Sequence, residues 1–209
     1  MAALRAQGPL IVLAALAALG ISQLLPSSGF GLAIRLGAAL VCVLVVPGAL
    51  AQRVLGQPQQ LGVAIAGALM WSLGFVALGL AITFAAGRSL TLTLVVIGAA
   101  AGVSLVGGLG VRRPSAWRVD AGPVAVITLL GLLLGVAVWW VSETIQGDGL
   151  FHLGRIRKLD ELAALESVGS VNEFADGGLH PGYAFPLWHA ALALVARLAD
   201  VDSALVVQY

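Results

Sequence analysis

The residue types that could do acid, base or ligand chemistry are concentrated between residues 143 and 189, where all three histidines of the chain lie. Asp148 and His152 are four residues apart, and Arg155 follows three residues later. On a helix these side chains project from one side. A carboxylate there could take a proton from a hydroxyl group, and an imidazole with a guanidinium could bind a phosphate. The alternative is that Asp148 only caps a helix and His152 only anchors it at the headgroups.

A second group of polar and aromatic residues lies in NEFADGGLHPGYAFPLWH, residues 172–189. Its glycines and prolines disfavour a long regular helix, so we expect a shaped loop. Stacking and hydrogen bonds from this loop could bind a sugar, and the candidate side chains are Glu173, Asp176, His180 and Tyr183. The alternative is an aromatic girdle at the membrane boundary with a capping aspartate.

The same region offers oxygen and nitrogen ligands for a divalent cation. None of the candidates has the tight spacing of a zinc motif such as HExxH. We therefore assign no metal ligand and leave the cofactor open. The residues considered are Asp148, His152, Glu173, Asp176 and His180.

The elements that must position these residues are apolar. Of the 209 residues, 60% are hydrophobic and 10% are charged, and the mean hydropathy is +1.02. This composition excludes a soluble enzyme, a disulfide scaffold and a disordered chain. No basic surface with interleaved aromatic residues suggests a nucleic acid, so the expected partner is the lipid bilayer. A span takes about 20 apolar residues, and the length therefore fits about six spans and one loop.

The predicted fold is an all-α polytopic transmembrane helix bundle with about six spans and one amphipathic interfacial helix in an outer loop. Residues 1–141 form a scaffold of about five helices. Residues 142–184 form the loop, with the amphipathic helix over 149–166, and residues 185–209 hold a sixth span and the start of a further helix. The five scaffold spans are expected at 9–25, 31–51, 61–86, 90–111 and 123–141.

Two sequence patterns within this scaffold favour a membrane bundle. The run 9–25 resembles a signal peptide, but it is long and further spans follow, which favours an uncleaved first helix. GxxxG patterns at 98–102 and 131–135 are expected to be surfaces on which helices pack.

The charges predict a topology. Seven arginines and no acidic residue precede Asp120, whereas all ten acidic residues lie from Asp120 onward. A cytoplasmic N-terminus puts most of the connector arginines inside, as the positive-inside rule requires. The loop 142–184 is then extracytoplasmic. The bias toward Ala, Gly, Leu and Val suits a gene of high GC content and hence a bacterial inner membrane.

The stretch GDGLFHLGRIRKL, residues 147–159, resembles the first outer loop of the GT-C superfamily of glycosyltransferases. The resemblance implies a multi-span enzyme that moves a sugar from a polyprenyl-phosphate donor to an acceptor on the non-cytoplasmic side, usually with inversion. Asp148 would match the acidic residue that acts as the base or orients the acceptor. His152 and Arg155 would match residues near the donor phosphate. Glu173, Asp176, His180 and Tyr183 are assigned by location alone.

Two features depart from that family. The acidic loop follows about the fifth span instead of the first, and members carry more spans than the sequence predicts here. Residues 205–209 open what reads as a seventh helix, so we expect an N-terminal fragment of a longer protein.

The competing hypothesis is a non-enzymatic polytopic membrane protein, either a docking or assembly partner or a transporter portion. Ion-coupled transport normally requires ionisable groups near the midplane of the spans. Here the spans are nearly uncharged, and Arg35 lies close enough to a helix end to reach the interface. Docking through the outer loop is therefore the main alternative to an enzyme.

Overall fold

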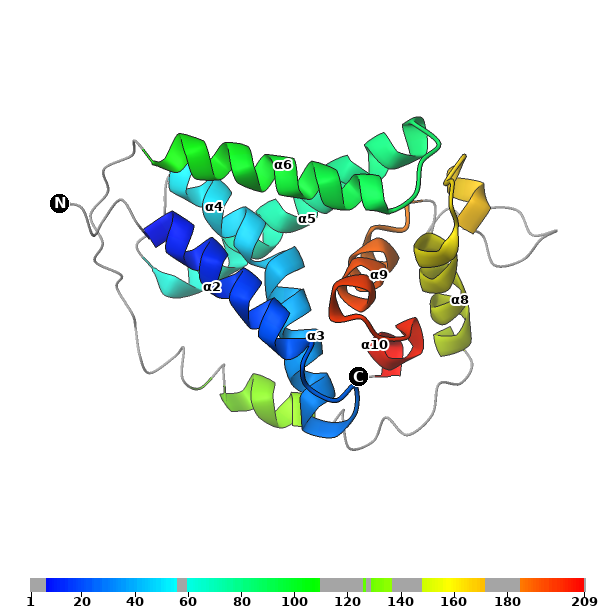
Figure 1. Ribbon diagram of the computed structural model, residues 1–209, viewed down its shortest axis with the longest axis horizontal. Coiled ribbons are helices and arrows are strands. Elements are labelled where there is room, and N and C mark those ends of the chain that lie inside the picture. Colours follow the sequence, from blue (N-terminus) through cyan, green and yellow to red (C-terminus); the bar gives the residue numbers. More distant parts are fainter. Residues whose placement is uncertain are drawn as a thin grey trace.

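The computed structural model describes residues 7–55, 60–109, 126, 129–136, 148–171 and 185–208. All regular structure within these ranges is helical, as predicted (Figure 1). The named helices are α2 (Gln7–Ser22), α3 (Gly29–Leu44), α4 (Val46–Leu55), α5 (Leu61–Ala85), α6 (Thr91–Gly108), α8 (Asp148–Glu161), η1 (Val168–Val171), α9 (Leu187–Ala199) and α10 (Ser203–Gln208).

Three helical segments are long and apolar enough to cross a membrane. They are Gly29–Leu55, which joins α3 to α4, together with α5 and α6. The chain is therefore an integral membrane protein, and the bilayer is its environment. The prediction of about six spans is not confirmed, because the described residues contain these three. Residues 129–136, inside the expected fifth span, are helical, but most of the rest of that span lies outside the described residues.

The first and sixth predicted spans are shorter helices than expected. The apolar part of α2 is Gly8–Ser22, and α9 has 13 residues. At 1.5 Å per residue α9 extends about 20 Å, which is less than the roughly 30 Å hydrocarbon core. A left-handed residue, Asp200, ends α9, and the chain turns there into α10.

Close helix packing uses glycines other than those in the GxxxG patterns. The backbone N–H of Gly48 on α4 donates to the hydroxyl of Ser72 on α5 at 2.9 Å, and a Cβ at Gly48 would collide with the carbonyl of Ala68. In contrast, a Cβ added at any of the glycines at 98, 102, 131 and 135 would meet nothing within 4 Å. The prediction that these four pack helices together is wrong within the described chain, because their faces point outward.

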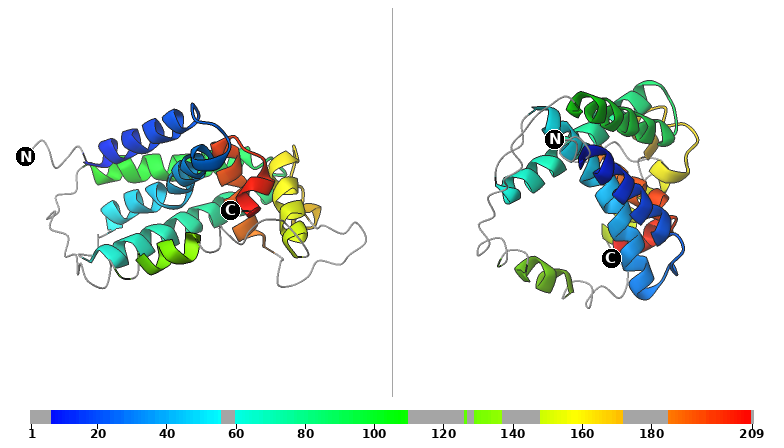
Figure 2. Two further views of the ribbon diagram at one scale, coloured as in Figure 1. Left: turned by 90° about the horizontal axis from the view of Figure 1, so that it is seen from below. Right: turned by 60° about the vertical axis from the view of Figure 1, so that its left-hand side comes forward.

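One end of the bundle carries the helices that follow residue 147. The α5–α6 turn meets the segment after α8, because the Leu165 N–H donates to the Arg88 carbonyl at 3.0 Å. The residues after α2 meet the end of α9, because Gln23 donates to the Leu198 carbonyl at 2.9 Å. Figures 1 and 2 show α8, α9 and α10 grouped at this end. The connector after the third predicted span therefore meets the segment that follows α8, and the connector after the first meets the end of α9.

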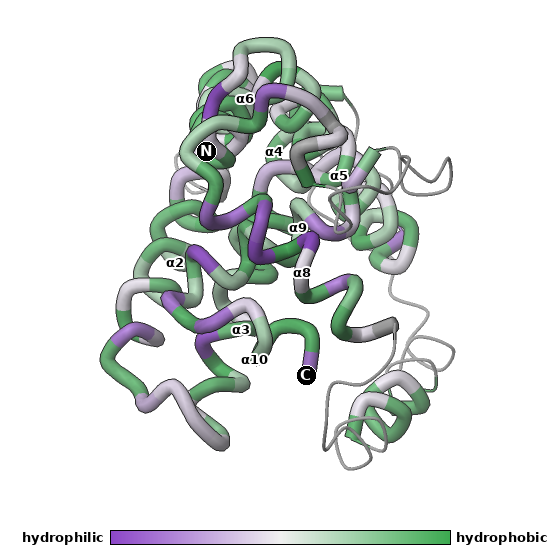
Figure 3. Tube along the Cα trace, turned by 90° about the vertical axis from the view of Figure 1, so that its right-hand side faces the viewer, coloured by the Kyte–Doolittle hydropathy of each residue, from purple (hydrophilic) through white to green (hydrophobic). Residues whose placement is uncertain are grey.

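The amphipathic helix is confirmed, but its apolar face covers protein. Leu153, Ile156 and Leu159 of α8 are buried, as expected for one face of an amphipathic helix, and Ile156 and Leu159 belong to a core shared with α9. The helix ends at Glu161 instead of near residue 166. In Figure 3 hydrophilic residues accumulate around this end of a mostly hydrophobic molecule. The α8–α9 interface is thus where polar side chains meet the apolar bundle.

Candidate functional site

Asp148 is the first residue of α8. The sequence suggested that it caps the helix, whereas its backbone is already helical. Its side chain lies outside what the structure describes. An acidic residue in the first turn still favours the helix, because the N-terminal end of the helix dipole is positive.

His152 is turned toward α9, where its partner is His189. Nδ1 of His152 lies 2.9 Å from Nε2 of His189, and the two ring planes are tilted by 33° with their centroids 5.1 Å apart. This separation is that of a hydrogen bond between ring nitrogens. The fold thereby joins two residues that are 37 positions apart in the sequence.

Arg155 lies one turn after His152 and is buried with only 1% of its surface exposed. Its guanidinium carbon is 5.6 Å from the centre of the Phe151 ring, a cation–π arrangement. Phe151 also meets the His152 ring edge-on, with centroids 5.3 Å apart. The site therefore combines an aromatic ring, two imidazoles and a guanidinium at the α8–α9 interface.

Burial and positive charge act together on His189. The residue is 4% exposed, and desolvation, then the charge of Arg155, then that of His152, lower the pKa of His189 to about 4. Each of these effects disfavours the protonated ring. His189 is therefore neutral at physiological pH, and Arg155 supplies the fixed positive charge of the site.

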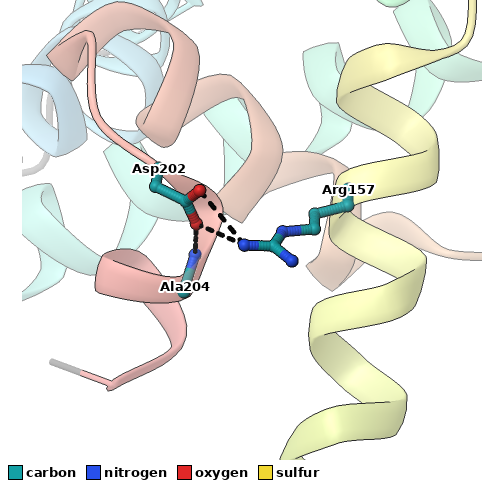
Figure 4. A network of polar contacts seen from close by, with 3 residues as sticks. All are labelled: Arg157, Asp202 and Ala204. Atoms are coloured by element: carbon teal, nitrogen blue, oxygen red, sulfur yellow. Dashed lines mark hydrogen bonds and ion pairs between the residues drawn. The ribbon is translucent and has the colours of Figure 1, made fainter.

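Two ion pairs hold α8 in place beside the site. Arg197 of α9 donates through Nε to Asp160 at 2.7 Å, and its other nitrogens reach the Asp160 carbonyl and the Thr91 hydroxyl. Arg157 binds Asp202 at 2.9 Å (Figure 4). Glu161 stands one helical turn after Arg157, but the partner of Arg157 is Asp202, because the turn between α9 and α10 brings this carboxylate close.

Asp202 also accepts a hydrogen bond from the Ala204 N–H at 2.7 Å, which caps α10 (Figure 4). This bond first, and then the Arg157 side chain, lower the pKa of the Asp202 carboxyl. The carboxylate therefore links the start of α10 to α8.

The other predicted site residues lie outside the described residues: Glu173, Asp176, His180 and Tyr183. Within the described ranges, no group of three or more His, Cys, Asp or Glu side chains could hold a metal ion. The histidine nitrogens are also closer together than the roughly 3.3 Å expected for two ligands at about 2.0–2.1 Å on a tetrahedral zinc ion. Their geometry favours a hydrogen bond.

The sequence analysis missed His189 as a site residue. A usable signal was present, since this histidine stands near the start of LWHAALALVARLA, a helix that is otherwise almost entirely apolar. A polar residue on the buried face of such a helix requires a partner. The spacing along the chain did not show that the partner would be His152.

The chain was compared with protein-family models, with curated proteins and with solved structures. None of the three comparisons finds a match.

Proposed function

We propose that this chain is part of a membrane glycosyltransferase of the GT-C type. The enzyme would move a sugar from a polyprenyl-phosphate donor to an acceptor on the extracytoplasmic face of a bacterial inner membrane, with the N-terminus of the chain in the cytoplasm. The observation that carries the proposal is the group formed by the buried Arg155 and His189 with the half-buried His152 at one end of an apolar bundle.

The charge of this group and its position along the spanning helices both suit a lipid-linked phosphate. A guanidinium keeps its charge when buried and matches the oxygens of a phosphate with paired donors. The segment after α8 meets the turn between α5 and α6, so in a bilayer spanned by these two helices the site would lie near the headgroups. A polyprenyl chain could remain among the lipids there while its phosphate reaches Arg155.

The proposed reaction is a single displacement. The acceptor hydroxyl oxygen attacks the anomeric carbon of the donor, and the bond from that carbon to the phosphate oxygen breaks with inversion. Asp148 takes the proton of the hydroxyl, and polyprenyl phosphate leaves with the electron pair. Arg155, with His152, offsets the charge that develops on the departing phosphate. Glu173, Asp176, His180 and Tyr183 would contact the sugar.

Asp148→Asn tests the assignment of the base, because the amide keeps the shape of the side chain but accepts a proton poorly. The assay is transfer from radiolabelled polyprenyl-phosphate mannose, glucose and arabinose in membranes that contain the protein at its natural length. We expect a loss of at least about a hundredfold, in line with removal of a general base. Expression and thermal stability should be unchanged.

Glu161→Gln is the matched control, because Glu161 is an exposed carboxylate at the other end of the same helix. We expect full activity in this variant. Transfer that survives Asp148→Asn would exclude Asp148 as the base. Equal losses in both variants would indicate that the charge of α8 matters instead of one carboxylate.

A further inference from the structure

The contact between His152 and His189 requires one ring nitrogen to donate and the other to accept. Nδ1 of His152 and Nε2 of His189 are 2.9 Å apart. If both nitrogens carried protons, two N–H groups would face each other at this distance and repel. The pair therefore keeps its contact only while at least one of the facing nitrogens is unprotonated.

His189 is the ring that remains neutral. It is buried on α9, and Arg155 adds a permanent charge beside it. With a pKa of about 4, His189 gives up its extra proton well before neutral pH is reached. Nε2 of His189 is therefore available to accept a hydrogen bond from an N–H at Nδ1 of His152.

Several charged groups on the described helices that pack against α9 engage other partners. Arg35 of α3 binds carbonyls at the far end of α9. On α8, Arg157 and Asp160 pair with Asp202 and Arg197. Helices α2, α5 and α10 contain no charged residue. Asp148 precedes His152 by one turn of α8 and is the nearest carboxylate in sequence.

We propose that His189 is a positioning residue, a neutral acceptor that fixes the ring of His152 so that this ring lies against an anionic phosphate bound at Arg155. The dyad formed by His152 and His189 acts beside Arg155, and His189 itself does not touch the ligand. The choice of a phosphate as ligand rests on the proposed function. The direction of the hydrogen bond within the dyad is independent of that function.

Nuclear magnetic resonance of the ring nitrogens tests the dyad directly. The protein is labelled with ¹⁵N-histidine and carries His180→Gln, which leaves two histidine rings to observe. On acidification we expect Nε2 of His189 to stay unprotonated until the pH approaches about 4. A scalar coupling between the two facing nitrogens should be present. Two rings that titrate independently as ordinary histidines would overturn the proposal.

Substitutions at His189 separate positioning from packing. The carbonyl oxygen of Gln can still accept the Nδ1–H of His152, whereas Met fills a similar volume without a strong acceptor. We expect His189→Gln to keep the proton of His152 on Nδ1 and His189→Met to lose this preference. If both variants leave the protonation pattern of His152 unchanged, His189 does not position it.

Ligand binding is measured with inorganic phosphate and with decaprenyl phosphate in nanodiscs. We expect His189→Met to weaken the binding of decaprenyl phosphate about tenfold, a change of about 1.4 kcal/mol, and His189→Gln to weaken it less. Equal weakening of inorganic phosphate would identify a general phosphate site, which also supports the dyad. Binding that no His189 variant alters would overturn its positioning role. Persistence of the nitrogen coupling without any binding of decaprenyl phosphate would instead contradict the proposed donor.

Discussion

Arg35 of α3 donates a hydrogen bond to the carbonyl oxygen of Ala199, the last residue of α9, at 3.2 Å. The same guanidinium binds the carbonyls of Gln23 and Leu25, which follow α2, and that of Asp200. Carbonyls at a helix C-terminus have no partner within the helix and carry partial negative charge. The arginine that was expected only to reach the interface therefore joins α2, α3 and α9.

Arg35→Ala should destabilise the end of the bundle that carries the site. It leaves several carbonyls without their charged donor, and one such hydrogen bond contributes about 1.5–3 kcal/mol. We expect a loss of about 2–3 kcal/mol in the free energy of unfolding, since some carbonyls will bind water instead. Unfolding in detergent can be followed by the reaction of a thiol dye with Cys42, the single cysteine.

Arg88→Ala provides the control for Arg35. Arg88 is exposed in the α5–α6 turn at the same end of the bundle, and its backbone carbonyl accepts from Leu165. Removal of its side chain takes away the same charge without a buried contact. The free energy of unfolding of the Arg88→Ala variant should stay within about 0.5 kcal/mol of that of the unaltered protein. Equal losses in the two variants would show that net charge, and not the carbonyl contacts of Arg35, stabilises this end.

Gly48→Ala should separate α4 from α5, because the added methyl group would overlap the backbone carbonyl of Ala68. Overpacking of this kind costs about 1–3 kcal/mol. Gly98→Ala is the matched change on the outward face of α6, where the methyl group meets nothing within 4 Å. We expect it to be neutral or slightly stabilising, because Ala favours a helix over Gly. The opposite order in thermal unfolding would contradict the described packing.

Asp202 should give a pH dependence to the docking of α8 on the α9–α10 turn. Its folded-state pKa is lowered, so its contribution is present above the unfolded-state pKa of about 3.9 and is lost as the pH falls through the lower folded-state value. The Arg157–Asp202 pair is exposed and screened by solvent, so it contributes less than about 1 kcal/mol.

Two substitutions distinguish the ion pair that Asp202 forms with Arg157 from its capping of α10. Asn can still cap α10 but has no charge, so Asp202→Asn should remove only the ion pair and its pH dependence. Asp202→Ala should cost about 1 kcal/mol more, because the cap on the Ala204 N–H is lost as well. Hydrogen exchange of the α10 amides measures both effects. Identical protection in the two variants would show that the cap contributes nothing.

The sequence predicted the helical class and the main spans because apolar runs and helical periodicity are local signals. The buried face of α8, Leu153, Ile156 and Leu159, followed from their spacing. The number of spans could not be predicted in the same way, since hydropathy alone does not separate a spanning helix from the shorter α2 and α9. The packing predicted for the GxxxG patterns was wrong for a related reason. Spacing identifies a helix face made of small residues but not whether a partner helix lies on that face.

The candidate site was only partly predictable. The sequence identified His152 and Arg155 by type and spacing on one helix. It could not pair His152 with His189 or Arg157 with Asp202, because both contacts depend on how α9 folds back on α8. Burial of Arg155 could not be predicted either, because arginine is usually exposed and no local pattern marked this one as buried.

The most direct test of the proposed function is native mass spectrometry of the protein at its natural length, purified in mild detergent and incubated with polyprenyl-phosphate sugars. We expect one donor to be retained, and Arg155→Lys to weaken retention because a lysine lacks the paired donors of the guanidinium. Arg157→Ala, a loss of charge on the exposed side of the same helix, should retain the donor. Absence of any retained polyprenyl phosphate, or equal retention in Arg155→Lys, would contradict the assignment of this site to a lipid-phosphate donor.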